Sequence, residues 1–187
     1  MLDGPKRVVG PGESLNIIHP SLSIEGFLTD NDKDYIEAGN NVGISKYMLS
    51  FVENADDVKQ LQTLVPGAEI AAKIESRKGM RYVANEWDGE SRLMTARGDL
   101  FVELRRPHHI TAAMEDIVTK DPNAILASRI FSSFAYSLEP SCSDIGDVDN
   151  ALRMGYRTFM LGDATCMNRD SVISSLNLFE AMGGRYK

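Results

Sequence analysis

The sequence has few of the residues that cross-link small extracellular domains or bind zinc. Its 187 residues include two cysteines, Cys142 and Cys166, and three histidines. Two cysteines are too few for a disulfide-rich scaffold, and neither has the spacing of a zinc site. We therefore expect two reduced thiols in a cytoplasmic protein.

Long hydrophobic runs and an excess of positive charge are also lacking. No apolar run reaches membrane-spanning length, and the N-terminus lacks a signal-peptide pattern, so we expect no membrane partner. The formal net charge is -7 and the pI about 5.0, which argues against general affinity for nucleic acid. A hydrophobic content of 43% and a charged content of 25% are typical of a globular domain.

The first 28 residues differ from the rest of the chain in their density of helix breakers. Glycine and proline stand at Gly4, Pro5, Gly10, Pro11, Gly12, Pro20 and Gly26. Such a density disfavours a long helix. We predict an irregular N-terminal segment over residues 1–28 and a barrel-type catalytic-domain segment over residues 29–187.

From Thr29 onward the hydrophobic pattern alternates between strand and helix. A first helix begins at Thr29, with Asp32 placed to complete a capping box. Five repeats of strand and helix follow: we predict strands at 47–52, 69–74, 92–96, 124–128 and 157–161, and helices at 55–64, 77–86, 107–119, 144–154 and 169–182. Alternation of this kind predicts an α/β fold with a parallel sheet.

Polar residues gather where the predicted strands end. They are Lys73, Glu75, Gly98, Asp99 and Ser128. Lys73 and Glu75 are two residues apart and so point to the same side of a strand. The carboxyl ends of parallel strands carry the site in both a βα barrel and an open doubly wound sheet, so this position does not choose between them.

Each of these residues has a structural interpretation as well as a functional one. Glu75 and Asp99 are hard oxygen ligands suited to Mg²⁺. Alternatively, Glu75 pairs with Lys73 or a nearby arginine, and Asp99 caps the following turn. Lys73 would then be a structural cation, and Ser128 an ordinary polar residue at a strand end.

Two motifs carry a resemblance to a known family. Ala-Ala-Lys-Ile-Glu at 71–75 and Thr-Ala-Arg-Gly-Asp-Leu at 95–100, with a helix between them, resemble pyruvate kinase. The resemblance runs from about residue 21 to residue 187 and covers the second half of that family's catalytic TIM barrel. The family's lid, early barrel strands and C-terminal domain have no counterpart in this chain.

The resemblance implies a reaction and a set of roles. The reaction would be phosphoryl transfer from phosphoenolpyruvate to ADP, giving pyruvate and ATP in glycolysis, with Mg²⁺ as cofactor. Glu75 and Asp99 would be the metal ligands, and Lys73 would stabilise the transferring phosphoryl group. Gly98 and Asp99 would bind the substrate carboxylate, and Ser128 would lie near the enolate. The family also uses K⁺, whose ligands lie on strands that this chain does not contain.

The sequence departs from the family pattern around these motifs. Phe101 replaces a glycine, Glu53 replaces an arginine, and Ser128-Arg129 stands where the family has Thr-Gln. Three alternatives fit: a divergent pyruvate kinase, a catalytically degenerate structural or partner-binding subunit, and a metal-dependent lyase or aldolase acting on a pyruvate-like enolate.

The number of predicted repeats is also unusual. Five βα units are fewer than the about eight strands of a closed barrel. A five-strand sheet would expose two edges. We expect the N-terminal segment, a second copy or partner chain, or the rest of a longer protein to cover them.

Overall fold

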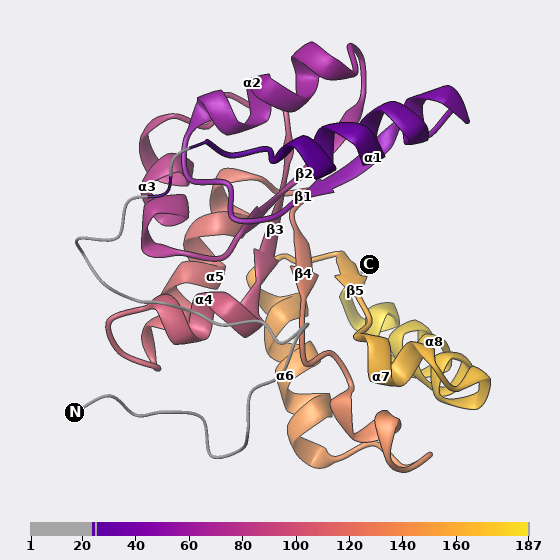
Figure 1. The fold of residues 1–187 in the computed structure, drawn as a ribbon. Coiled ribbons are helices and arrows are strands. Elements are labelled where there is room, and N and C mark those ends of the chain that lie inside the picture. Colours follow the sequence, from indigo (N-terminus) through magenta and orange to yellow (C-terminus); the bar gives the residue numbers. More distant parts are fainter. Residues whose placement is uncertain (1–23, 25, 187) are drawn as a thin grey trace, which may run out of the picture.

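The computed structural model describes residue 24 and residues 26–186 (Figure 1). Most of the predicted irregular segment 1–28 lies outside this part, so that division remains a prediction. The helices are α1 Asp30–Asn41, α2 Ala55–Leu64, α3 Arg77–Asn85, α4 Arg97–Glu103, α5 His109–Lys120, η1 Ser132–Ala135, α6 Cys142–Met154, α7 Asp163–Cys166, α8 Arg169–Gly183 and η2 Gly184–Tyr186. The strands are β1 Lys46–Leu49, β2 Glu69–Ile74, β3 Arg92–Ala96, β4 Ile125–Ala127 and β5 Thr158–Met160.

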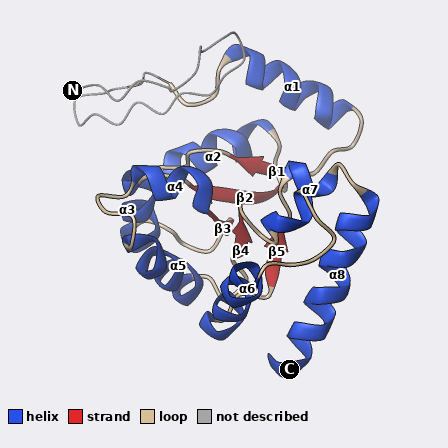
Figure 2. Ribbon diagram, turned by 90° about the horizontal axis from the view of Figure 1, so that it is seen from below, coloured by secondary structure: helices blue, strands red, loops and turns tan. Residues whose placement is uncertain are grey.

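The five strands form one parallel sheet in the order β1-β2-β3-β4-β5. This order confirms the predicted α/β class and the predicted parallel pairing. Seen along the strands, the sheet curves, and helices α2, α3, α5 and α6 lie around its outside (Figure 2). Neighbouring strands that are also consecutive in the chain are the arrangement found in a βα barrel.

Side-chain caps start most of the longer helices. Thr29 and Asp32 form the predicted capping box at the start of α1, and Asn54 and Asp57 form a second one at α2. The side chain of Asn168 caps α8, as its residue type also predicts. These caps satisfy the first backbone N–H groups, which have no partner inside a helix.

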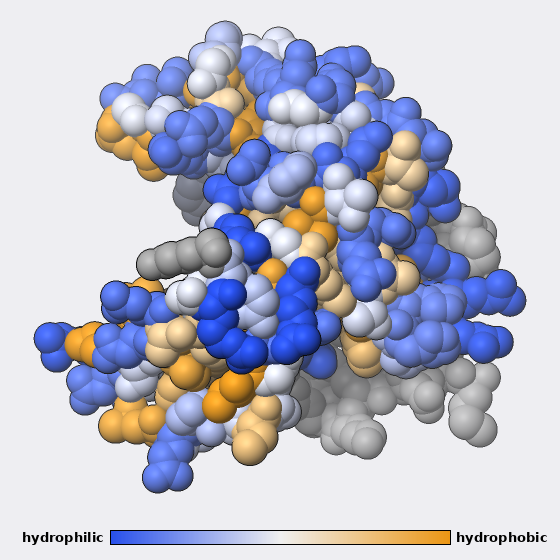
Figure 3. Space-filling model, turned by 180° about the vertical axis from the view of Figure 1, so that it is seen from behind, coloured by the Kyte–Doolittle hydropathy of each residue, from blue (hydrophilic) through white to orange (hydrophobic). Residues whose placement is uncertain are grey.

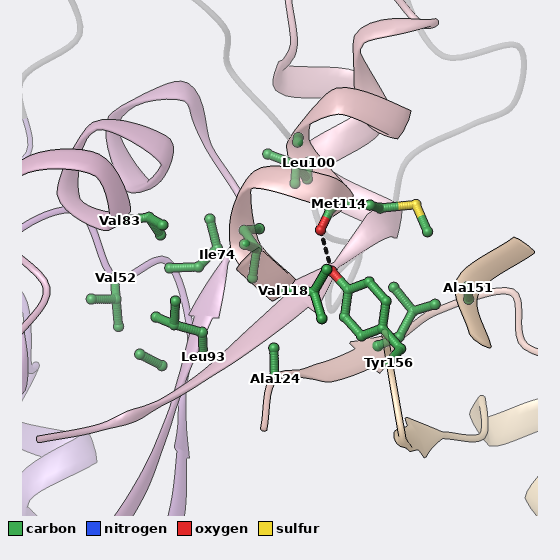
Figure 4. Close-up of a cluster of buried hydrophobic side chains, with 14 of the residues drawn as sticks. Val52, Ile74, Val83, Leu93, Leu100, Met114, Val118, Ala124, Ala151 and Tyr156 are labelled. Atoms are coloured by element: carbon green, nitrogen blue, oxygen red, sulfur yellow. Dashed lines mark hydrogen bonds between the residues drawn. The ribbon is translucent and has the colours of Figure 1, made fainter. Parts of the chain in front are cut away.

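The core lies between the outer helices and the convex face of the sheet. Along β2, the alternate residues Ile70, Ala72 and Ile74 are buried, and Leu93 of β3 continues the same layer. Figure 4 shows Ile74 and Leu93 together with side chains from α3, α4 and α5. The intervening residues of β2 point to the concave face, which is why that face carries Lys73.

One polar group is built into this core. The Tyr156 side chain is fully buried, and its hydroxyl donates to the Met114 carbonyl at 2.8 Å (Figure 4). A second hydrogen bond, of 2.6 Å, joins it to the Thr95 hydroxyl on β3. Burial raises the pKa of Tyr156 to about 12, so the phenol stays neutral and ties α5 to the sheet.

The face seen from behind is mostly hydrophilic (Figure 3). From behind, hydrophobic side chains form several separate groups (Figure 3). Among the described helices, none is both long and apolar enough to cross a membrane.

Several predicted boundaries were wrong in an informative way. The first strand ends at Leu49 rather than at residue 52, and the fourth ends at Ala127 rather than at residue 128. Phe51 and Ser128 adopt positive φ angles of 52° and 70°, which no strand can contain. The short helices α4, η1 and α7 were not predicted, because a helix of one or two turns leaves little periodicity in a sequence.

We predict that Tyr156→Phe lowers the free energy of unfolding by about 1–3 kcal/mol, because the Met114 carbonyl and the Thr95 hydroxyl lose a buried partner. Urea unfolding followed by circular dichroism would measure it. Tyr136→Phe is the control, since Tyr136 is 91% exposed and should change little. Equal effects of the two substitutions would contradict this role for the phenol.

Candidate active site

A buried acid and a lysine meet at the carboxyl end of β2. Glu75 is 2% exposed and directly follows the strand, and Lys73 lies two residues before it on the concave face. The Lys73 Nζ and Glu75 Oε1 atoms are 3.0 Å apart, so the two side chains lie on one side and form the ion pair that the structural interpretation offered. Lys73 also donates to the Ser50 hydroxyl at 2.8 Å.

The environment of Glu75 contains opposing influences on its ionisation. Burial raises the pKa of this carboxyl above its usual value. The Phe51 N–H and the Lys73 ammonium act in the opposite direction, whereas the nearby charge of Asp99 raises the pKa further. Two carboxylates close enough to repel each other are an arrangement that a divalent cation would favour.

The turn after β1 supplies the second contact of Glu75. The Phe51 N–H donates to Glu75 Oε2 at 2.7 Å. Phe51 reaches this position in the left-handed region, with φ 52°. Left-handed conformations of residues other than glycine are rare and concentrate at functional sites.

Glu53 stands where the family pattern has a positively charged residue. Two neighbouring side chains offset the negative charge of its carboxylate. Its Oε1 accepts a hydrogen bond of 2.6 Å from the Ser76 hydroxyl, and its Oε2 lies 3.3 Å from the Lys78 ammonium. Near Glu53, burial raises the pKa of Glu103 at the end of α4. The charge of Arg77 lowers that pKa, while those of Glu53 and Asp99 raise it. The surroundings of Glu53 and Glu103 therefore contain both positive and negative side chains.

The end of β3 brings the other predicted site residues together. Gly98 and Asp99 lie in the first turn of α4, which begins immediately after β3. A Cβ atom at Gly98 would stand 3.3 Å from the Ser128 hydroxyl, so helix α4 approaches the end of β4 closely. Gly98 and Ser128, which the resemblance assigns to the substrate site, therefore lie close together.

The sequence analysis overlooked three residues of this arrangement: Ser50, Phe51 and Arg97. Arg97 is buried, donates to the Ser128 carbonyl at 2.7 Å and pairs with Asp147 at 2.7 Å. A charged residue directly after a buried strand was the available signal for Arg97. No sequence pattern predicted that Asp147, on α6, would pair with Arg97.

The carboxylates of Glu75 and Asp99, if they held a metal ion, would suit magnesium better than a transition metal. Within the described part of the chain, no group of three or more histidine, cysteine, aspartate or glutamate side chains is placed to hold a metal. Two carboxylates, Glu75 and Asp99, are a set that leaves room for water and substrate oxygens around Mg²⁺. A carboxylate offers about four acceptor sites, and Glu75 uses two of them on Lys73 and Phe51.

The fold and the site together define a class of protein. Consecutive parallel strands surrounded by helices, with the polar cluster at their carboxyl ends, form a segment of a βα barrel with its active-site edge. The pyruvate kinase barrel-domain family matches residues 6–169, and the chain belongs to this family.

Individual relatives agree with this assignment, and a solved structure agrees with the fold. A pyruvate kinase of Thermoplasma acidophilum is 28% identical over 158 residues, covering 80% of this chain and 29% of the relative. Pyruvate kinase 2 of Synechocystis is 31% identical over 160 residues, covering 79% and 26%. A solved pyruvate kinase from Cryptosporidium parvum superposes with a TM-score of 0.74 at 23% identity, covering 84% of this chain and 35% of that one. The chain thus spans less than a third of the length of these two curated relatives.

We predict that Glu75→Gln stabilises the protein more at pH 7 than at pH 4. A carboxyl whose pKa is raised by folding contributes its stability below the unfolded pKa and loses it as pH rises through the folded pKa. The amide has no such loss, so the difference in free energy of unfolding between the variant and the wild type should grow with pH. Urea unfolding at several pH values would measure it, with the exposed Glu69→Gln as control.

Proposed function

We propose that this chain carries the phosphoryl-transfer site of a pyruvate kinase, which moves the phosphoryl group of phosphoenolpyruvate to ADP. The observation that carries the proposal is the buried Glu75 carboxylate in contact with Lys73 at the active-site edge of the sheet. A lysine beside a metal-binding acid provides the positive charge on which phosphoryl transfer depends. The free, exposed thiols of Cys142 and Cys166 support a cytoplasmic location.

Glu75 and Asp99 would hold Mg²⁺ in this proposal. When bound, the ion supplies positive charge against the phosphoryl oxygens, where negative charge must be neutralised. The burial of Glu75 keeps its carboxylate in a low-dielectric setting, which strengthens its attraction for a cation.

The other residues would bind and orient the substrate. Lys73, held in place by Glu75 and the Ser50 hydroxyl, would face the phosphoryl group during transfer. Gly98 and Asp99 would bind the carboxylate, because glycine lets a ligand come close to the backbone. The bond between the enol oxygen and phosphorus breaks as the ADP oxygen bonds to phosphorus. Ser128 would deliver a proton to the enolate carbon, directly or through water.

Calorimetric titration of phosphoenolpyruvate in the presence of Mg²⁺ tests the site directly. We expect saturable binding that Lys73→Met weakens by at least about 10-fold, since a charged hydrogen-bond donor is lost. Lys73→Met should also abolish transfer to ADP while the thermal unfolding transition is kept. Lys59→Met is the matched control, because the Lys59 side chain is 62% exposed on α2. Turnover like that of the wild type in Lys73→Met would overturn the assignment.

We further propose that the two sheet edges are covered by additional strands, either from a longer form of this chain or from a partner or second copy. In the described part, β1 and β5 each have a strand on one side. Met48 on the edge strand β1 is 61% exposed. Exposed edges with apolar side chains favour pairing with another chain. Sedimentation velocity should therefore show self-association of this chain, and a monomer at all concentrations would count against the second-copy form.

A further inference from the structure

Three cationic side chains come from the carboxyl ends of β2, β3 and β4, and they differ in how they are held. Lys73 is bound by Glu75 and Ser50. Arg97 is bound by Asp147 and the Ser128 carbonyl. Arg129 packs against an aromatic ring, and within residues 26–186 no carboxylate or carbonyl partner is recorded for it. Its N–H groups are therefore the ones open to a ligand.

The Arg129 guanidinium lies over the Phe101 ring, with its central carbon 5.2 Å from the ring centroid. A cation–π contact of this kind does not use the N–H groups of the guanidinium as hydrogen-bond donors, so they stay available. It also reduces the number of orientations that a long side chain would otherwise sample. Arg129 is exposed, and the Phe101 ring supports its guanidinium at the surface.

The Arg129 guanidinium stands beside the proposed substrate site. Gly98 and Phe101 are three residues apart on α4, so they lie on the same face of the helix. Gly98 lies close to the Ser128 side chain, and Phe101 contacts the next residue, Arg129. One face of α4 therefore presents the proposed carboxylate-binding glycine and the ring that orients Arg129.

The backbone of this loop is held in an unusual conformation. Ser128 and Arg129 have successive positive φ angles of 70° and 59°. Arg97 holds this loop, because its guanidinium donates to the Ser128 carbonyl through two nitrogens, at 3.2 and 2.7 Å. Consecutive left-handed residues other than glycine persist where the surrounding contacts hold them. The backbone position from which the Arg129 side chain extends is therefore set by the fold.

We infer that Arg129 is an anion-binding residue of this site, which holds a carboxylate or phosphate group in the plane of its guanidinium while stacked on Phe101. The planar fork matches the two oxygens of either group. A chain with a net charge of -7 needs such a local cation to hold an anionic substrate. That the anion belongs to phosphoenolpyruvate depends on the proposed function, whereas the anion site itself does not.

The first experiment follows the Arg129 side chain directly. The Nε–Hε resonance of Arg129 would be assigned by its loss in Arg129→Gln, then followed by NMR during titration with inorganic phosphate, acetate and phosphoenolpyruvate with Mg²⁺. We expect a saturable shift, with phosphate and acetate showing which kind of group the fork takes. An Arg129 resonance that none of the three anions moves would overturn the inference.

Binding affinity provides the second experiment. In calorimetry with phosphoenolpyruvate and Mg²⁺, we expect Arg129→Gln to weaken binding by at least about 10-fold, since charged hydrogen bonds are lost. Arg129→Lys should weaken it less, because the charge stays while the fork is lost. Phe101→Leu should also weaken it, since Arg129 loses its stacking surface. Arg105→Gln is the control, because Arg105 is exposed just beyond α4.

The outcomes separate this inference from the proposed function. Equal affinities of Arg129→Gln and Arg105→Gln would overturn the inference and leave the pyruvate kinase assignment standing. Absence of phosphoenolpyruvate binding, with phosphate or acetate still shifting the Arg129 resonance, would overturn the assignment and keep the anion site. Thermal unfolding of each variant identifies loss of fold, and Arg129→Lys serves as the test if Arg129→Gln does not fold.

Discussion

The buried carboxylate of Glu75 is the constraint on which the rest of the site depends. An ionised acid removed from water is costly unless it is paired and hydrogen-bonded, and Glu75 is 2% exposed. Its two oxygens are served by Lys73 and by the Phe51 N–H. A left-handed residue costs roughly 1–2 kcal/mol, whereas a hydrogen bond to a charged group contributes about 1.5–3 kcal/mol. The bond to Glu75 is thus large enough to hold Phe51 in its strained conformation.

The turn at Phe51 and Val52 also determines how β2 and α3 pack around it. The Val52 N–H donates to the Lys73 carbonyl at 3.2 Å, and the Val52 carbonyl faces the first turn of α3. A Cβ atom at residue 79 would lie 2.8 Å from this carbonyl, so the close approach requires Gly79. The Glu53 carboxylate accepts a hydrogen bond from the Ser76 hydroxyl, which also caps α3. The end of β1, the end of β2 and the start of α3 form one interlocked unit around the acid.

The sequence allowed the architecture to be predicted better than the site. Alternating strand and helix periodicity identified all five strands and their parallel pairing, because both depend on patterns spread over many residues. The spacing of Lys73 and Glu75 predicted that both side chains lie on one side for the same reason. The turns at Phe51 and Ser128 were missed, because left-handed conformations without glycine carry no local signal. The partnership of Arg97 and Asp147 was missed because it joins residues 50 apart in the chain.

The position of the site within the sheet makes it sensitive to a distant part of the molecule. Glu75 and Lys73 lie on β2, but Phe51 and Ser50 follow β1, which is an edge strand in the described part. An edge strand pairs on one side and frays more readily than a central one. Loss of β1 pairing would withdraw the Phe51 N–H and leave the buried Glu75 carboxylate with Lys73 alone. Any strand that covers β1 would therefore stabilise the site without contributing a side chain to it.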